Sequence, residues 1–273
     1  MTLKSYNFVE LNRKHHMKQV KDFTIVETQR YNEMYSRLRL RPAESAGLPE
    51  NILPGQFVQV AVETPGVFLR RPISVNNVDY RSNTIDLLVR KAGKGTEALM
   101  NMAEGETVNV LLPLGNGFTT DMTFVKGRIL LVGGGVGVAP LLYLGKVLRD
   151  AGHSPEFLLG ARSERDLLQV EEFEKVGRVH LSTEDGSAGE KGLVTGNSAF
   201  SGELGMIYCC GPSPMMKAVA AIAREKGVAC EVSLENMMAC GLGACLCCVE
   251  NTVKGNVCVC TEGPVFNIEM LNW

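Results

Sequence analysis

Residues 128–148 read RILLVGGGVGVAPLLYLGKVL, an apolar run that ends in glycines and leads into a segment with the apolar spacing of a helix. A strand, a glycine-rich turn and a helix in this order are typical of an α/β nucleotide-binding domain. Glycines let the backbone approach a pyrophosphate, and the N-terminus of the following helix supplies amide donors and a positive dipole end. The turn therefore predicts a dinucleotide site at four residues: Gly133, Gly134, Gly135 and Gly137.

The turn departs from the dinucleotide fingerprint G-x-G-x-x-G, because Val138 stands where the last glycine or alanine is expected. No acidic residue clearly ends the second strand to hold a ribose. A tight strand–helix turn without a ligand therefore stays open as an alternative. Apolar strands and helical segments nonetheless alternate along the chain, which predicts a parallel sheet covered by helices over residues 123–229.

A second strand–helix junction has the sequence CCGPSP at residues 209–214. In open α/β sheets, ligands bind outside the carboxyl ends of the strands. We therefore expect the thiol of Cys210 to face the same nucleotide site, and the family resemblance given below implies that Gly211 and Pro212 line it as well. A small buried cysteine ahead of a proline that starts a helix is the alternative.

Upstream, residues 17–122 contain short strand-like segments separated by proline and glycine turns. Branched or alternating apolar residues occur in DFTIVETQRY, MYSRLRLRP, GQFVQVAVE, RPISVNNVD, TIDLLVRK and ETVNVLLPLG. Several short strands at this spacing are typical of an antiparallel barrel or sandwich. One helix is expected at GTEALMNM, with Thr96 capping its start.

The strand segment RPIS carries the candidate ligand-binding residues of this first domain. An arginine and a serine on one strand suit a diphosphate, which makes Arg71 and Ser74 the candidates. A glycine-rich helix start at Gly95 would add backbone donors. The alternative is that Arg70 and Arg71 are solvated strand ends.

Six of the nine cysteines lie between residues 240 and 260. Cys240, Cys245, Cys248 and Cys260 follow the pattern C-x4-C-x2-C with a distant fourth cysteine, as in plant-type 2Fe–2S clusters. Structural zinc is the alternative, although its cysteines typically come as paired knuckles. The spacing therefore predicts a small iron–sulfur module over residues 230–273.

The bulk composition excludes several other classes of protein. The formal net charge is −2 and no long Lys/Arg run is present, so nucleic acid and anionic membranes have no electrostatic attraction to this chain. The least charged stretch, residues 129–145, carries five glycines and a proline, which is unlike a membrane-spanning helix. Residues 1–16 are polar, with no apolar signal region, and are expected to be an extension of a cytoplasmic protein.

Taken together, these motifs resemble the ferredoxin–NADP reductase superfamily. RPIS, GKGT, LPLGNGF, GGGVGVAP and CCGPSPMM occur here in that superfamily's order. The C-terminal segments CGLGACLCCV and CTEGPVF resemble one branch of it, the electron-transfer subunits of dihydroorotate dehydrogenase B. The resemblance covers residues 18–270.

The resemblance implies a specific set of cofactor contacts. FAD would be contacted by barrel residues: Arg71, Pro72, Ile73, Ser74, Leu88, Val89, Arg90, Gly95 and Thr96. The cluster would be held by Cys240, Cys245, Cys248 and Cys260, with Cys260 preferred to Cys258 because it directly precedes TEGPVF. The roles of Cys247 and Cys258 stay open. Because the redox chemistry belongs to the cofactors, no catalytic acid or base is expected.

The nucleotide partner is less clear from the residues alone. Arg162, Ser163 and Arg165 follow the second strand of the nucleotide domain and would suit the 2′-phosphate of NADP. Glu164 and Asp166 place negative charge beside the same loop, and the resemblance implies NAD. We expect NAD(H) as the substrate.

The resemblance also implies a partner. An FMN-containing dihydroorotate dehydrogenase catalytic subunit would oxidise the substrate, in a heterotetramer with two copies of each chain. Two other functions remain open: a subunit of a ferredoxin:NADP or sulfide-linked oxidoreductase, and a non-catalytic redox sensor that binds NADH.

Overall fold

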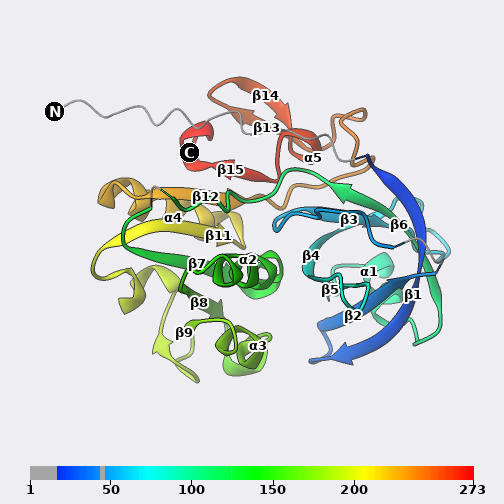
Figure 1. Ribbon diagram of the computed structural model, residues 1–273, viewed down its shortest axis with the longest axis horizontal. Coiled ribbons are helices and arrows are strands. Elements are labelled where there is room, and N and C mark those ends of the chain that lie inside the picture. Colours follow the sequence, from blue (N-terminus) through cyan, green and yellow to red (C-terminus); the bar gives the residue numbers. More distant parts are fainter. Residues whose placement is uncertain (1–16, 44–46, 124) are drawn as a thin grey trace.

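The computed structural model describes residues 17–43, 47–123 and 125–273. A strand barrel and an α/β body lie side by side, and the cysteine-rich segment lies along the top of the molecule in Figure 1. The polar stretch 1–16, expected to be an extension, falls outside the described residues. None of the helices among the described residues is long and apolar enough to cross a bilayer.

The N-terminal strands close into a barrel in the order β1-β2-β5-β4-β3-β6, with antiparallel neighbours throughout. Side chains alternate between its two faces: on β3, Val58 and Val60 pack in the barrel core, whereas Phe57 packs against the neighbouring domain. The antiparallel barrel predicted from the sequence is confirmed. Its elements are β1 (Gln19–Arg30), β2 (Tyr35–Pro42), β3 (Phe57–Val60), β4 (Arg71–Asp79), β5 (Thr84–Arg90), α1 (Lys94–Met100) and β6 (Thr107–Leu114).

The second body is a seven-stranded sheet in the order β10-β9-β8-β7-β11-β12-β15, parallel except for its last strand. Leu130 and Val132 of β7 pack on the face that α4 covers, and Leu131 packs on the face that α2 covers. The predicted parallel sheet, buried on both faces, is confirmed. Its elements are β7 (Arg128–Gly134), α2 (Ala139–Asp150), β8 (Pro155–Ala161), α3 (Val170–Glu174), β9 (Arg178–Thr183), β10 (Glu190–Lys191), β11 (Leu204–Cys210), α4 (Ser213–Lys226), β12 (Ala229–Ser233) and β15 (Val265–Asn267).

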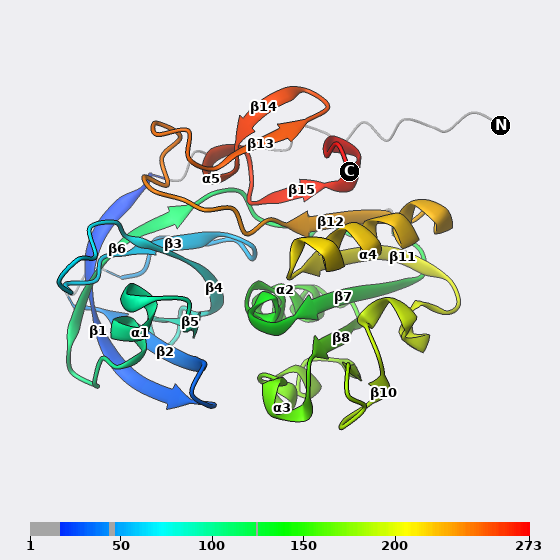
Figure 2. The same ribbon diagram turned by 180° about the vertical axis from the view of Figure 1, so that it is seen from behind.

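The strand order of this sheet reverses between β7 and β11. Strands β8, β9 and β10 extend from one side of β7, whereas β12 follows on the far side of β11. Ligands of open α/β sheets bind outside the carboxyl ends of the strands at such a switch point. In Figure 2 the arrowheads of β7 and β12 point toward the barrel, so this crevice faces the barrel domain.

The cysteine-rich segment is joined to the sheet rather than set apart from it. After β12 the chain forms the cysteine loop, the hairpin β13 (Val249–Thr252) and β14 (Gly255–Cys258), and the short helix α5 (Val259–Glu262). Strand β15 then pairs antiparallel with β12. The boundary expected at residue 229 coincides with the start of β12, and residues beyond it supply the last two strands of the sheet.

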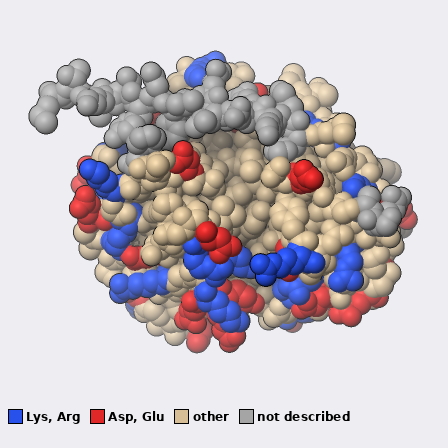
Figure 3. Space-filling view, in the orientation of Figure 1, with Lys and Arg blue, Asp and Glu red and all other residues tan. Residues whose placement is uncertain are grey.

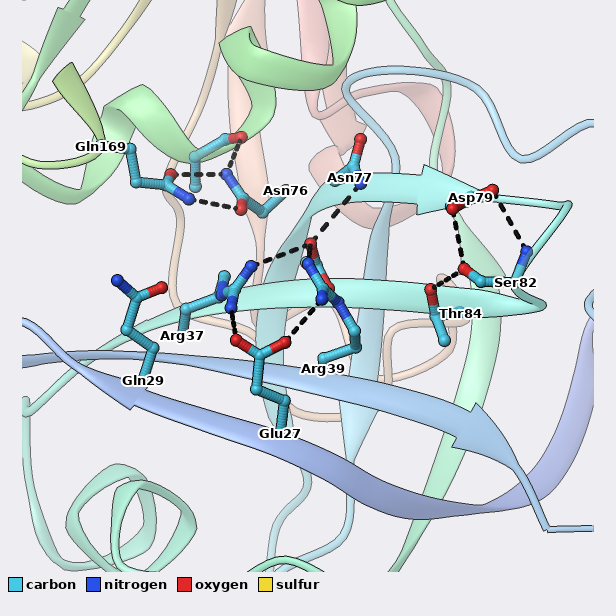
Figure 4. Close-up of polar contacts among 12 residues, drawn as sticks. Glu27, Gln29, Arg37, Arg39, Asn76, Asn77, Asp79, Ser82, Thr84 and Gln169 are labelled. Atoms are coloured by element: carbon cyan, nitrogen blue, oxygen red, sulfur yellow. Dashed lines mark hydrogen bonds and ion pairs between the residues drawn. The ribbon is translucent and has the colours of Figure 1, made fainter. Parts of the chain in front are cut away.

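Polar contacts fix the barrel against the α/β body. Asn76 of β4 donates from Nδ2 to Oε1 of Gln169 at 2.9 Å, and Gln169 Nε2 donates back to Asn76 Oδ1 at 3.0 Å. Figure 4 shows this amide pair next to a charged barrel network, in which Arg39 pairs with Glu27 and Asp86. The amide pair is buried, so it holds the two bodies in one relative orientation.

Candidate functional site

The two consecutive arginines at the start of β4 have opposite surroundings. Arg70 is well partnered, because its guanidinium donates to the carbonyl oxygens of Gln59 at 3.2 Å and Asn109 at 3.1 Å. Arg71 has a buried Nε without a hydrogen-bond partner, and a Cβ added to Gly95 would lie 2.6 Å from that atom. Buried polar groups are nearly always paired, and guanidinium pairs well with phosphate. Arg71 and Gly95 thus form a cradle that fits the diphosphate of a dinucleotide.

The other residues expected around the flavin differ in burial and in the element that carries them. Ser74 is half-buried opposite Phe57 in the ladder, and Ile73 lies in the barrel core. Thr96 stabilises the turn before α1, because its hydroxyl oxygen accepts the amide of Gly93 at 3.1 Å. It does so from inside the helix, at the third helical position, rather than as the capping residue.

Strand β5 connects the barrel to the nucleotide domain. Val89 packs in the barrel core and Leu88 in the core around α2, while Arg90 is exposed and Pro72 on β4 is half-buried. Arg90 lies close enough to Tyr35 to oppose the rise in the tyrosine pKa that burial causes. One end of β5 therefore reaches the junction of the two domains.

Tyr35 brings the barrel to the glycine turn. Its hydroxyl lies 3.7 Å from the position that a Cβ of Gly135 would occupy. The sequence did not single out this tyrosine, because MYSRLRLRP carries only the pattern of a strand. The structure therefore places the start of β2, which pairs with the end of β5, beside the glycine turn.

The four glycines of the turn have two different roles. Added Cβ atoms on Gly133 and Gly134 would collide with Val138 and Met215, and Gly137 lies directly against the carbonyl oxygen of Cys210. These three glycines are required by packing within the protein. Gly135 has a φ of +57° and faces open space apart from Tyr35, so it is the glycine that leaves room for a ligand.

The CCGP junction completes the same crevice. Gly211 lies back to back with Gly134, and its neighbour Cys210 is buried, which raises the pKa of the thiol well above its usual value. The Cys210 Sγ is 4.0 Å from Oε1 of Glu235. Desolvation by the surrounding chain raises the pKa of Glu235, and the charge of Arg90 opposes that rise, although the residue as a whole is exposed.

Glu235 was not identified from the sequence, since a single glutamate in EVSLENMM has no distinguishing spacing. The structure brings it to the crevice at the end of β12. Figure 3 shows that the middle of the face seen in Figure 1 carries few charged side chains, while charges of both signs gather along the lower part.

Backbone amides point at the sulfurs of the cysteine loop. The amide of Leu242 donates to Cys240 Sγ at 3.3 Å, and the amide of Gly243 donates to Cys260 Sγ at 3.1 Å. The Cys260 amide donates to Cys248 Sγ at 3.4 Å. Led by the Leu242 amide, such contacts lower the pKa of Cys240 to about 6. Hydrogen bonds to cysteine sulfur are characteristic of iron–sulfur sites, so the donor set fits a cluster.

The spaced cysteines lie close to one another. Cys240 lies beside Cys245, and Cys248 lies beside both Cys258 and Cys260. Among the residues that the structure describes, no three Cys, His, Asp or Glu side chains surround a single metal position.

The two additional cysteines differ from these four. Cys247 is exposed, and Cys258 donates from its thiol to the carbonyl oxygen of Gly243 at 3.8 Å. The same glycine donates its amide to Cys260. Cys260 is therefore placed as a hydrogen-bond acceptor and Cys258 as a donor, while burial raises the pKa of both thiols.

Three family models match the chain in sequence order. An oxidoreductase FAD-binding domain matches residues 22–118, and an oxidoreductase NAD-binding domain matches residues 131–221. The iron–sulfur cluster binding domain of dihydroorotate dehydrogenase B matches residues 235–272. The fold and these matches define an oxidoreductase subunit that binds FAD, NAD and an iron–sulfur cluster, which confirms the predicted cofactors.

Curated relatives make the assignment more specific. The chain is 41% identical over 221 residues to the dihydroorotate dehydrogenase B (NAD(+)) electron transfer subunit of Shouchella clausii strain KSM-K16, covering 79% of this chain and 85% of the relative. It is 43% identical over 225 residues to the subunit of the same name from Lysinibacillus sphaericus strain C3-41, covering 80% and 87%. The chain belongs to the family of dihydroorotate dehydrogenase B electron transfer subunits.

Solved structures share the architecture. A chain from the structure of an NADH-dependent reduced ferredoxin–NADP oxidoreductase, described in connection with flavin-based electron bifurcation, superimposes with a TM-score of 0.81 at 32% identity. It covers 92% of this chain and 90% of that one. The ferredoxin reductase of a carbazole 1,9a-dioxygenase superimposes with a TM-score of 0.63 at 22% identity, covering 77% and 67%, and shares the fold.

Proposed function

We propose that this chain carries electrons from an FMN-containing dihydroorotate dehydrogenase catalytic subunit to NAD+, by way of a 2Fe–2S cluster and FAD. One observation carries the proposal: the cysteine loop lies directly against the flavin strand pair. Gly241, next to Cys240, packs on the side chain of Gln59, and Gln59 faces Pro72 of the RPIS segment across the ladder. Short separation of two redox sites is what electron transfer between them requires.

The bound cofactors supply the redox chemistry, because FAD exchanges one electron or two and so links a one-electron cluster to a two-electron nicotinamide. The chain's own residues bind and orient. Arg71 and Gly95 hold the FAD diphosphate, and the open turn at Gly135 admits NAD(H) beside Tyr35. No residue is assigned as a general acid or base.

Cys240, Cys245, Cys248 and Cys260 are proposed as the cluster ligands. The amide donors to three of these sulfurs support the assignment, as does the opposite polarity of the Cys258 contact. The remaining FAD contacts expected from the sequence, from Pro72 to Thr96, and the nicotinamide contacts at residues 210–212 are proposed on the same basis of position.

The ligand assignment predicts opposite behaviour of two neighbouring cysteines. Cys260→Ser should abolish the visible spectrum of the cluster, because it removes a thiolate that closes the site. Cys258→Ser should retain about two irons and two sulfides per chain, as the wild type does. Iron and labile sulfide analyses check both variants. A Cys258→Ser protein without cluster would show that the fourth ligand was assigned wrongly, and stoichiometric zinc in the wild type would exclude the electron-transfer route.

NAD is proposed as the nucleotide in preference to NADP. In the loop that would meet a 2′-phosphate, Ser163 already donates its hydroxyl to Asp166 at 2.9 Å, and the Arg165 side chain lies 4.0 Å from the same carboxylate. Asp166 thus binds the Ser163 hydroxyl and stands beside Arg165, and its negative charge would repel a 2′-phosphate there. A higher specificity constant for NADPH than for NADH in dye-reduction assays would reverse this choice.

The catalytic subunit is proposed to dock on the cysteine-rich module in a heterotetramer with two copies of each chain, in the cytoplasm. Met237, Leu242 and Leu246 are 84%, 47% and 64% exposed around the cysteine loop. Phe266 is buried in the core on the α4 face of the sheet, and Met238 is half-buried against that core, so neither belongs to the exposed set. Three exposed apolar side chains beside the cluster suit a partly apolar interface.

Activity with and without the partner tests this assembly. The complex should reduce NAD+ with dihydroorotate, whereas this chain alone should only pass electrons from NADH to dyes. Dihydroorotate oxidation by the isolated chain would contradict the proposal. A chain of a ferredoxin–NADP oxidoreductase is also similar. If this chain co-purified with a different oxidoreductase and did not respond to the FMN subunit, a role as a subunit of a ferredoxin:NADP-type oxidoreductase would be favoured.

A further inference from the structure

Gln59 is a buried glutamine whose entire side-chain amide lacks a partner. It is 0% exposed, and neither Nε2 nor Oε1 makes a hydrogen bond. Among the described residues, five buried side-chain nitrogen or oxygen atoms are unpartnered, and two of them belong to this one amide. Gln56 and Gln169 are also buried, and both have partnered amides. Gln59 is therefore an exception within its own protein.

The Gln59 side chain points away from the barrel core and toward the cysteine loop. Its strand neighbours Val58 and Val60 fill the barrel, so Gln59 projects from the opposite face of β3. There it meets Gly241: a Cβ on this glycine would lie 3.0 Å from Gln59 Cγ and 3.1 Å from Nε2. Gly241 has a φ of +70° and directly follows Cys240, so the amide lies beside the first cluster ligand.

A buried amide without a hydrogen-bond partner is unfavourable. In native proteins such amides usually have a partner once all cofactors are bound. The group that completes this neighbourhood is the cluster, whose sulfurs accept hydrogen bonds from amides. We propose that Gln59 is a positioning residue that donates a hydrogen bond from Nε2 to a sulfur of the 2Fe–2S centre. A donor to cluster sulfur favours the reduced, more negative state, so Gln59 raises the reduction potential of the cluster.

The inference rests on the proposed cluster ligands, but it is tested independently of them. Gln59→Met removes the donor and keeps nearly the same shape, so the variant should bind the normal complement of iron and sulfide. Its cluster should have a more negative midpoint potential. We expect roughly a tenfold change in the ratio of oxidised to reduced cluster at a fixed potential, equivalent to about 59 mV for a one-electron couple. Redox titration followed by the electron paramagnetic resonance of the reduced cluster measures it.

Gln56→Met is the matched control. Gln56 is buried just before the start of β3, but its Nε2 donates to the Gly115 carbonyl at 2.8 Å and its Oε1 accepts the Leu53 amide at 2.8 Å. Removing those bonds should lower the melting temperature of the metal-free chain and leave the cluster potential unchanged. Gln59→Met should instead shift the cluster potential and leave the melting temperature of the metal-free chain unchanged, since it removes no hydrogen bond from that chain.

Several results would overturn the role of Gln59. One is an unchanged cluster potential in Gln59→Met with full iron content, and another is a shift in the flavin potential instead of the cluster potential. Destabilisation of the metal-free Gln59→Met chain equal to that of Gln56→Met would also count against it. The ligand assignment is tested separately by Cys240→Ser. This variant should lose the cluster, whereas Gln59→Met should retain it.

Discussion

At the scale of single residues, side chains of the same type that are neighbours in the sequence differ in their hydrogen-bond partners. Arg70 and Arg71 adjoin in the sequence, yet only Arg71 keeps a buried nitrogen unpartnered. Cys258 and Cys260 differ in the same way, because one thiol donates to Gly243 and the other accepts from it. A ligand site is recognised here by hydrogen-bonding capacity that the protein itself leaves unused.

Arg71→Ala should weaken FAD binding by roughly 10- to 150-fold, since a hydrogen bond to a charged group contributes about 1.5–3 kcal/mol. Fluorescence titration of the flavin-free chain with FAD measures the affinity. Arg70→Ala is the control: it should lower thermal stability, because Arg70 ties β3 to β6, and leave FAD affinity near that of the wild type. Equal losses of affinity in both variants would show that Arg71 has no special contact with the cofactor.

At the scale of secondary-structure elements, the turns were predictable and their contacts were not. Strand, glycine turn and helix at 128–148 follow from apolar periodicity, and the barrel follows from short strands between turn residues. Strand β15 escaped prediction because three residues carry no readable period. Gln59 and Glu235 escaped because lack of a partner and closeness to a crevice are properties of the folded chain, and each lies in an ordinary strand or loop sequence.

Gly137→Ala should be destabilising by about 1–3 kcal/mol, the usual cost of forcing an extra carbon into a packed site. The added Cβ would overlap the Cys210 carbonyl oxygen and push the glycine turn away from the CCGP junction. NADH affinity should fall together with stability, as measured by chemical denaturation and NADH titration. Gly196→Ala, where nothing lies within 4 Å of the added carbon, should leave both unchanged. A stable Gly137→Ala protein with normal NADH binding would contradict this packing role.

At the scale of the whole molecule, function depends on how the barrel and the sheet are held together. The amide pair of Asn76 and Gln169 and the bond from the Tyr143 hydroxyl to the Ile52 carbonyl, at 2.9 Å, cross the junction where the cofactor sites meet. Hydride transfer needs the reacting atoms held at close range, so a loosened junction slows it even when both cofactors bind.

Gln169→Leu should therefore lower the rate of flavin reduction by NADH while FAD and iron contents stay normal. It leaves Asn76 Oδ1 buried without a donor, which should destabilise the fold by about 1–3 kcal/mol. Stopped-flow absorbance and denaturation measure the two effects. Gln29→Leu, on the half-buried surface of β1, removes only the acceptor of a 3.5 Å hydrogen bond from the Tyr31 hydroxyl and is the control, with a smaller effect on both expected. Wild-type rates in Gln169→Leu would show that this amide pair does not hold the reacting geometry.

Strand β15 has a consequence for how the chain comes into being. It ends only a few residues before Trp273, yet it covers the edge of β12, the strand on which Glu235 and the cysteine loop depend. While the chain is being synthesised, every other strand of the sheet emerges first, and the edge of β12 stays open until Val265–Asn267 have left the ribosome. An uncovered edge is a template for pairing with other chains. The last strand of this sheet to be made is thus the one that protects the β12 edge from aggregation.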